Sequence, residues 1–242
     1  MDSYNIIKVN ATKSTNDKVK MLIKSKKINH SDLIFAKYQY KGRGQTNNRW
    51  YSSYDKNLLC SLYYDLSKES NYTIPKLNFI VGLSVLKTIS FFSNQKISIK
   101  WPNDILAENK KISGILIENK IKSGKIIYSI IGVGININQT NFKRIPNATS
   151  LKSIEGKEFN SDHLLDKLIE NYKLFFLESK DENLILKEYN NCLYGKVECK
   201  FLIQDKVFFG KVVEVIKNGN LVAEIESIGL KEFKTGEIKI LI

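Results

Sequence analysis

The sequence predicts an α+β fold in two parts, a strand-rich mixed domain followed by a small β-barrel-like tail. The apolar fraction of 43% beside 26% charged residues is typical of a chain that buries a core. One long apolar segment runs from Pro75 to Phe92 and indicates a central helix among short strand patterns. From about residue 195 only short strands and turns follow. We therefore predict one domain over 1–190 and a second over 191–242.

Six segments of the first part have the apolar runs of β-strands, and polar turns separate them. They are residues 4–9, 33–39, 57–66, 97–101, 112–118 and 126–135. In the second part, turns are expected over 217–220 and near Gly229 and Gly236.

The first helix is predicted directly after the first strand, where apolar residues recur at helical spacing. Ser14 or Thr15 is its expected N-cap, and Ser14 with Asp17 three residues later imitates a capping box. Further helices are expected from Pro75 to Phe92 with the proline at the first position, over 161–178 with Ser161 or Asp162 as cap, and over 181–193.

The chain carries a formal charge of +13, and this excess lies near its start. Residues 1–60 hold 12 basic and 4 acidic side chains, a net charge of +8, whereas residues 190–242 hold 8 and 7. A basic nucleic-acid-binding protein is therefore one alternative, although no zinc-finger spacing or basic helix supports it. Solvated lysines explain most of the charge, and a basic loop can also hold one small polyanion such as a nucleotide.

Several classes of chemistry have little support. The N-terminus lacks the layout of a signal peptide and no window of eighteen apolar residues occurs, so we expect a cytoplasmic protein with no membrane contact. Cys60, Cys192 and Cys199 lack the paired spacing of a zinc or redox site and are expected to be buried thiols. His30 and His163 have no nucleophile or second ligand nearby in the sequence, which argues against histidine catalysis.

The segment GRGQTNNRW over 42–50 is the first candidate for ligand binding. Its glycines let backbone N–H groups approach an anion, Arg43 and Arg49 supply charge, and Trp50 offers a flat face for a base. A long hairpin loop anchored by the tryptophan is the alternative. The segment is neither a Walker loop nor a GxGxxG motif, so the common nucleotide-binding folds are unsupported.

Three further segments are ambiguous when each is taken alone. IKWPNDIL over 99–106 is a strand entering a tight turn, and it places Lys100 beside an indole. KKISGILIE over 110–118 puts Lys111 before a strand in which Gly114 leaves room for a ligand, although a charged turn is an equal alternative. In IIGVGININ over 130–138, Asn136 ends an apolar run that is otherwise typical of a core strand.

In this order, KSTND, YQYKGRGQTNNRW, IKWPND, KKISGILIE, GVGININ and NATSL resemble the biotin–protein ligases. The likeness spans essentially the whole chain, and GKVV and TGEIKI look like the family's small C-terminal domain. The resemblance implies a mixed-sheet catalytic domain of the biotin/lipoyl ligase type with an SH3-like β-barrel behind it. Because the catalytic pattern starts within the first fifteen residues, a ligase without the N-terminal DNA-binding domain of bifunctional members is expected.

The resemblance also implies a reaction. Biotin and ATP form biotinyl-5′-AMP, with Mg²⁺ expected, and a lysine of a biotin carboxyl carrier protein then takes the biotinyl group. Lys111, Arg43 and Asp104 are the implied catalytic residues, with Asp104 orienting or deprotonating the incoming lysine. The implied biotin-binding residues are Ser14, Thr15, Asn16, Gln39, Gly42, Arg43, Gly44, Gln45, Lys111 and Gly114; the implied nucleotide-binding residues are Arg49, Trp50, Lys100, Asn103 and Asn136.

One position departs from the family. Many members read GRGR in the loop, whereas this chain reads GRGQ, so Gln45 stands in place of a cation that helps to retain the adenylate. An amide hydrogen-bonds phosphate without charge, so looser retention is expected unless Arg49 or Lys41 substitutes.

Lipoate or octanoate ligases and transferases of the same fold are the nearest alternative function. They usually carry an RRxxGGG-type loop, which is absent here, and the KWPND string favours biotin. A homodimer is possible by analogy, and the sequence identifies no metal ligands.

Overall fold

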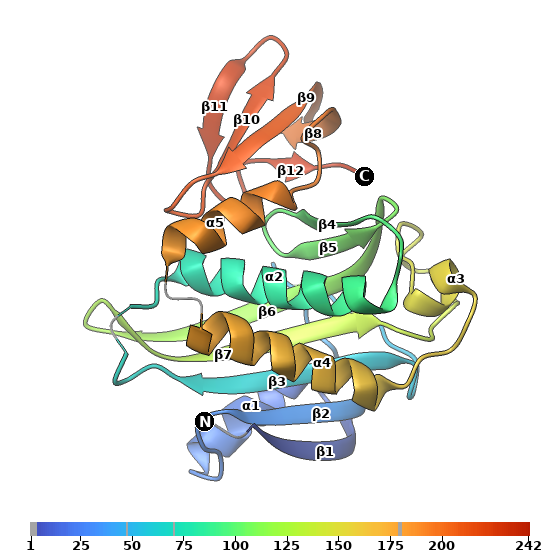
Figure 1. Ribbon diagram of the computed structural model, residues 1–242, viewed down its shortest axis with the longest axis vertical. Helices are drawn as coiled ribbons and strands as arrows, with labels where there is room; N and C mark the ends of the chain where they lie inside the picture. The colour runs from blue at the N-terminus through green and yellow to red at the C-terminus, as the bar shows by residue number, and fades with distance from the viewer. Residues whose placement is uncertain (1–3, 47, 70, 179–180) are drawn as a thin grey trace.

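The computed structural model describes residues 4–46, 48–69, 71–178 and 181–242, and it confirms a mixed α+β fold with a second, smaller sheet (Figure 1). The large sheet has seven strands in the order β1-β2-β3-β7-β6-β5-β4. β1 and β2 are parallel and every other pair is antiparallel, which makes the sheet mixed. The strands are β1 (Asn5–Thr12), β2 (Asp32–Gln39), β3 (Asn57–Asp65), β4 (Ile97–Lys100), β5 (Asp104–Ala107), β6 (Lys110–Lys122) and β7 (Lys125–Asn136).

Helices cover both faces of this sheet. Figure 1 shows α2 (Ile74–Phe92) and α4 (Ser161–Lys173) lying across the front, while α1 (Thr15–Lys24) packs against β2, β3 and β7 on the other face. The remaining helices are α3 (Leu151–Glu155), α5 (Glu182–Asn191) and the π-helical turn η1 (Leu174–Glu178).

The two faces of β7 differ because side chains alternate along a strand. Val133 and Ile135 join the main core beneath α2. Gly132 and Gly134 lie on the α1 face, where side chains from α1 and the 42–50 loop approach the backbone. Glycine on one face only therefore leaves a hollow in the sheet on the α1 side.

Helix starts differ from the sequence prediction in detail. Ser14 is the N-cap of α1 as predicted, but its side chain makes no capping bond, so the predicted capping box is wrong; Ser14 lines a cavity instead. α2 begins at Ile74, capped by Thr73, one residue before the expected start. Asn160, rather than Ser161 or Asp162, caps α4, because its side chain accepts bonds from two N–H groups of the first turn.

The hairpin of β4 and β5 was only half predicted. The expected turn follows Lys100, but Asp104–Ala107 returns as a strand of four residues, too short to show a period in sequence. β5 pairs with β6 and thereby places Asp104 opposite Gly114. This pairing brings the KWPND and KKISG segments side by side.

The C-terminal sheet has five antiparallel strands in the order β11-β10-β9-β8-β12. β11 and β12 are both edge strands, so over the described residues the SH3-like sheet is open rather than a closed barrel. Trp101 Nε1 donates to Gly219 O at 3.0 Å and links the two sheets. The strands are β8 (Cys199–Ile203), β9 (Lys206–Val215), β10 (Leu221–Ile225), β11 (Gly229–Phe233) and β12 (Lys239–Ile240).

α2 is the one helix, in the ranges described above, that is long and apolar enough to cross a membrane. Of its apolar stretch, 67% is buried inside the fold, beneath α4 and against the sheet. Its apolar character thus serves the core.

The cysteines are free thiols. Cys60 and Cys199 are buried as predicted, whereas Cys192 is only half-buried because it lies at the end of α5. Burial raises the pKa of the Cys60 thiol and raises that of Cys199 to about 11, so neither is a ready nucleophile.

Candidate active site

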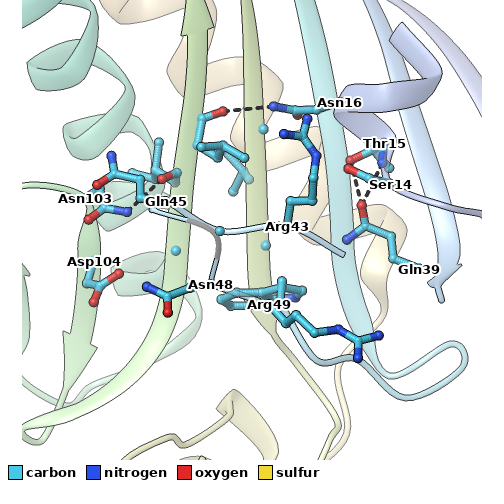
Figure 2. Close-up of a pocket in the computed structure, with 18 of the residues that line it drawn as sticks. Ser14, Thr15, Asn16, Gln39, Arg43, Gln45, Asn48, Arg49, Asn103 and Asp104 are labelled. Carbon is cyan, nitrogen blue, oxygen red and sulfur yellow. Dashed lines mark hydrogen bonds between the residues drawn. The ribbon is translucent and has the colours of Figure 1, made fainter. Parts of the chain in front are cut away.

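Two adjoining cavities lie on the α1 side of the large sheet. The first has a volume of about 190 Å³ and the second about 320 Å³. Both are lined by Arg49, Trp50, Asp104 and Lys111, so these four residues form the junction. Figure 2 shows Thr15 and Gln39 at one end of the first cavity and Asn103 and Asp104 across from them.

The cavities gather nearly all residues that the resemblance assigned to catalysis, biotin binding or nucleotide binding; Lys41, the expected substitute for a cation at position 45, lines neither. Of the assigned residues, Gly42 alone lies outside both linings, and it closes the neck of the loop: its carbonyl accepts a bond from Trp50 N at 3.0 Å. The first cavity is lined by Ser14, Thr15, Asn16, Gln39, Arg43, Gly44, Gln45, Arg49, Trp50, Asn103, Asp104, Lys111 and Gly114; Lys100 and Asn136 line the second.

The floor of the first cavity is backbone covered by the Trp50 indole. A Cβ placed on Gly134 would lie 2.5 Å from Trp50 Cε2, and one on Gly114 would lie 2.9 Å from Trp50 Cζ3. The glycines are required because the ring rests directly on the strands. The indole N–H is buried and has no acceptor among the described residues. An unpaired buried donor costs about 1–3 kcal/mol, so it favours a ligand that supplies an acceptor.

A buried polar network forms the end of the first cavity beneath α1. The Thr15 backbone N and Oγ1 lie 2.7 and 3.1 Å from Gln39 Oε1. The Ser61 hydroxyl lies 2.7 Å from Thr15 Oγ1 and 2.5 Å from Asn16 Oδ1. The Ser14 hydroxyl and the Gln39 amide nitrogen make no hydrogen bond within the described part of the chain, so they can bind a polar ligand.

An ion cluster fixes the loop above the network. Arg43 makes two bonds to Glu118, at 3.1 and 2.7 Å, and contacts Asp17 at 2.9 Å. Lys20 and the Asn16 amide complete the cluster, at 2.7 and 2.8 Å from the Glu118 carboxylate. Burial disfavours the charged form of Glu118, but these bonds outweigh it and hold its pKa at about 2. Arg43 therefore anchors the loop, with its charge already matched.

Asp104 joins two lysines at the junction. Its carboxylate lies 2.5 Å from Lys111 Nζ and 3.9 Å from Lys100 Nζ. Burial lowers the pKa of Lys100, and Asp104 opposes that shift. The Lys111 ammonium also lies 5.8 Å from the centre of the Trp50 ring. Two cations thus share one carboxylate at the point where the cavities meet.

The segment over 140–149 forms one wall of the second cavity. Lys111 N donates to Asn147 O at 2.8 Å, and Thr149 N donates to Lys111 O at 2.9 Å. Asn136 Nδ2 donates to Thr149 O at 3.0 Å, and Asn103 Nδ2 likewise bonds a backbone oxygen, of Ile115, at 2.9 Å. The side-chain nitrogens of both asparagines are therefore occupied by backbone.

Sequence reasoning missed four residues of this region on which the site depends: Tyr51, Ser61, Glu118 and Arg144. A lone polar residue in the buried run NLLCSLYY was the available signal for Ser61. Glu118 ends the strand predicted over 112–118, where a charged side chain normally faces solvent, but β6 continues to Lys122; Arg144 lies on a loop. Among the described residues no three His, Cys, Asp or Glu side chains gather where they could hold a metal ion.

Comparison with known proteins agrees with this geometry. The sequence pattern of the biotin/lipoate A/B protein ligase family matches residues 9–136. The bifunctional ligase/repressor BirA of Escherichia coli K12 is 27% identical over 220 residues, which cover 88% of this chain and 67% of that protein. A biotin–[acetyl-CoA-carboxylase] ligase of Mycobacterium tuberculosis is 24% identical over 62% of this chain and 56% of its own length.

Among solved structures, the biotin protein ligase of Aquifex aeolicus in complex with biotin and ATP superposes with a TM-score of 0.79. The two are 27% identical, and the match covers 98% of each chain. The likeness thus includes the C-terminal sheet.

Proposed function

This chain belongs to the biotin/lipoate A/B protein ligase family, and we propose that it is a biotin–protein ligase. It activates biotin with ATP as biotinyl-5′-AMP and transfers the biotinyl group to a lysine of a carrier protein. The observation that carries the proposal is the meeting of two cavities, one closed by neutral polar groups and one lined by cations, at Lys111.

The first cavity suits biotin. Its polar end offers the Ser14 hydroxyl and the Gln39 amide nitrogen beside the bonded Thr15 and Asn16, a mixture of donors and acceptors that matches a ureido group. The Trp50 indole, which covers the glycine floor, lines an apolar passage for the ring system and its aliphatic chain together with Ile115, Leu116 and Val133. A carboxylate at the end of that chain would then reach Lys111.

The second cavity suits ATP. Trp50 offers its ring to the base, and Arg49, Lys100 and Lys111 offer charge to the phosphates. We assign Mg²⁺ to the nucleotide, as the magnesium–ATP substrate.

At the junction a carboxylate oxygen of biotin attacks the α-phosphorus, and the bond to the departing pyrophosphate breaks. Lys111 lies between two anions that repel each other, and its charge stabilises the charge that builds on phosphorus. In the second step the amine of the carrier lysine attacks the biotinyl carbonyl and AMP leaves. Asp104 accepts or orients the amine proton once the substrates have drawn the two lysines toward phosphate.

The partners and context are part of the same proposal. We assign the carrier role to a biotin carboxyl carrier protein, a cytoplasmic location to the enzyme and a possible homodimer to its assembly. Residues 1–190 form the catalytic domain and 191–242 the SH3-like domain. No DNA partner is proposed.

Pyrophosphate exchange with three acids tests the substrate. Biotin is expected to support incorporation of labelled pyrophosphate into ATP, while lipoate and octanoate are not. Exchange with lipoate in place of biotin would assign the chain to the lipoate branch of the family.

Filter binding tests the alternative of a basic nucleic-acid-binding protein. We expect no salt-sensitive affinity for nucleic acid from the same preparation, and tight, salt-sensitive binding would favour that alternative.

A further inference from the structure

The charges that line the two cavities are not equally available to a ligand. Arg43 is matched by Glu118 and Asp17, and Lys111 by Asp104. Lys100 is close to the same aspartate, and Gln45 is neutral. Two lining cations, Arg49 and Arg144, have no carboxylate partner among the described residues. Unmatched positive charge at a cavity wall favours an anionic ligand.

These two arginines flank one tyrosine. The guanidinium carbon of Arg49 lies 5.6 Å from the centre of the Tyr51 ring, and that of Arg144 lies 5.7 Å from it. Contact with an aromatic ring helps to hold a guanidinium in place and leaves N–H groups for other bonds; one of those of Arg49 donates to Tyr40 O at 3.4 Å. Tyr51 thus gathers two cations from separate loops beside one cavity.

The loop that carries Arg144 is fixed against the junction. The backbone of residues 147–149 pairs with that of Lys111. Two turns connect this pairing with Arg144: Ala148 N donates to Ile145 O, and Ile145 N donates to Phe142 O. Asp104 is the one acidic side chain among the residues that line the second cavity in the described structure. An anion there meets four cations: Lys100 and Lys111, which lie near Asp104, and the two arginines, which lie near Tyr51.

We propose that Arg144, together with Arg49, binds the β- and γ-phosphates of ATP and the pyrophosphate that leaves. The inference rests on the proposed function, because it places the nucleotide in the second cavity. Because Arg144 would contact only the phosphates that leave, its loss should weaken the binding of ligands that carry a polyphosphate. Binding of ligands without one should not change.

Equilibrium binding of a nonhydrolysable ATP analogue and of AMP, each measured without biotin, tests the assignment. In Arg144→Ala the Kd for the analogue should rise about tenfold, the size of a lost charge-assisted hydrogen bond, while the Kd for AMP stays unchanged. Arg144→Lys should recover part of the loss, because it keeps the charge without the planar fork. Lys143→Ala is the matched control, since this neighbouring exposed cation lines a third cavity, which it shares with Arg144, but does not line the second.

Three results would overturn the assignment: analogue binding by Arg144→Ala equal to wild type, an equal loss for AMP, or a wild type that does not bind the analogue. Arg144→Glu supplies a second variant, expected to weaken the analogue further than alanine. Wild type that binds the analogue but makes no biotinyl-5′-AMP would refute the proposed function and leave the phosphate assignment standing.

Discussion

The two cavities of this ligase are organised in opposite ways. The first is built on α1 and the sheet, and its polar groups largely satisfy one another: Thr15 with Gln39, Ser61 with Asn16, and Arg43 with Glu118. The second is walled by loops, and Arg49 and Arg144 lack carboxylate partners within the described chain.

We attribute the difference to the substrates proposed for the two cavities. A neutral ring system such as biotin's is recognised by placed donors and acceptors, which must be held rigidly by neighbours. A nucleoside triphosphate is highly charged, and cations without a carboxylate partner bind its phosphates more strongly than paired ones. Changes in the first cavity should therefore act on biotin, changes in the second on ATP, and changes at the junction on the chemistry.

The junction should give the largest effect. Lys111→Ala is expected to slow biotinyl-5′-AMP formation at least about a hundredfold, roughly 3 kcal/mol of barrier, because the reacting anions lose a fixed cation. Pyrophosphate exchange measures it, with the thermal midpoint as a check on the fold. Lys110→Ala is the matched control, an exposed lysine one residue away that lines neither cavity. Wild-type exchange in Lys111→Ala would contradict the assigned role.

Ser61→Ala tests whether the first cavity acts on biotin alone. Removing this hydroxyl leaves Asn16 Oδ1 without its close partner, which costs about 1–2 kcal/mol and raises the KM for biotin about tenfold. The KM for ATP should not change. Ser129→Ala is the control, a buried serine on β7 whose hydroxyl bonds Asn119 away from the cavity. An equal rise of both KM values in Ser61→Ala would mean that the cavities do not act separately.

The ion cluster should be visible as a pH dependence of stability. The folded protein holds the pKa of Glu118 at about 2, below its ordinary 4.5, so protonation favours the unfolded chain. The stabilisation from Glu118 is complete above pH 4.5 and is lost as pH falls toward 2. Urea unfolding across this window should show a shallower loss of stability in Glu118→Gln than in wild type. The same slope in both proteins would exclude Glu118 as the source.

Gln45→Arg should have the smallest effect. An added guanidinium beside the first cavity is expected to slow release of biotinyl-5′-AMP about threefold, because a charged donor replaces a neutral amide near the phosphate. Release is followed by chasing labelled adenylate with unlabelled biotin and ATP. Equal release rates would show that the other cations already supply what position 45 lacks.

Sequence reasoning was strongest where one segment carries its own signal. The apolar helix ending at Phe92 and the strand patterns around GVGIN were predicted because packing periodicity is local, and ordered motifs led to Lys111 and Trp50. The short strand β5 escaped, since four residues show no period.

The missing parts of the site are those made by distant partners. Arg43 and Glu118 are 75 residues apart in sequence, and Ser61 is 45 residues from Asn16. Nothing in either local sequence predicts such a pair. The expectation that Gln45 loosens adenylate retention has the same limit. It considered only the cations of the same loop, Arg49 and Lys41, and did not include Arg144, which is distant in sequence.

The most direct test of the account is to incubate the purified protein with biotin and α-labelled magnesium–ATP, then look for a labelled acyl adenylate. We expect biotinyl-5′-AMP from wild type, accompanied by pyrophosphate, and only traces from Lys111→Ala. Absence of the adenylate from well-folded wild type that binds both substrates would contradict it.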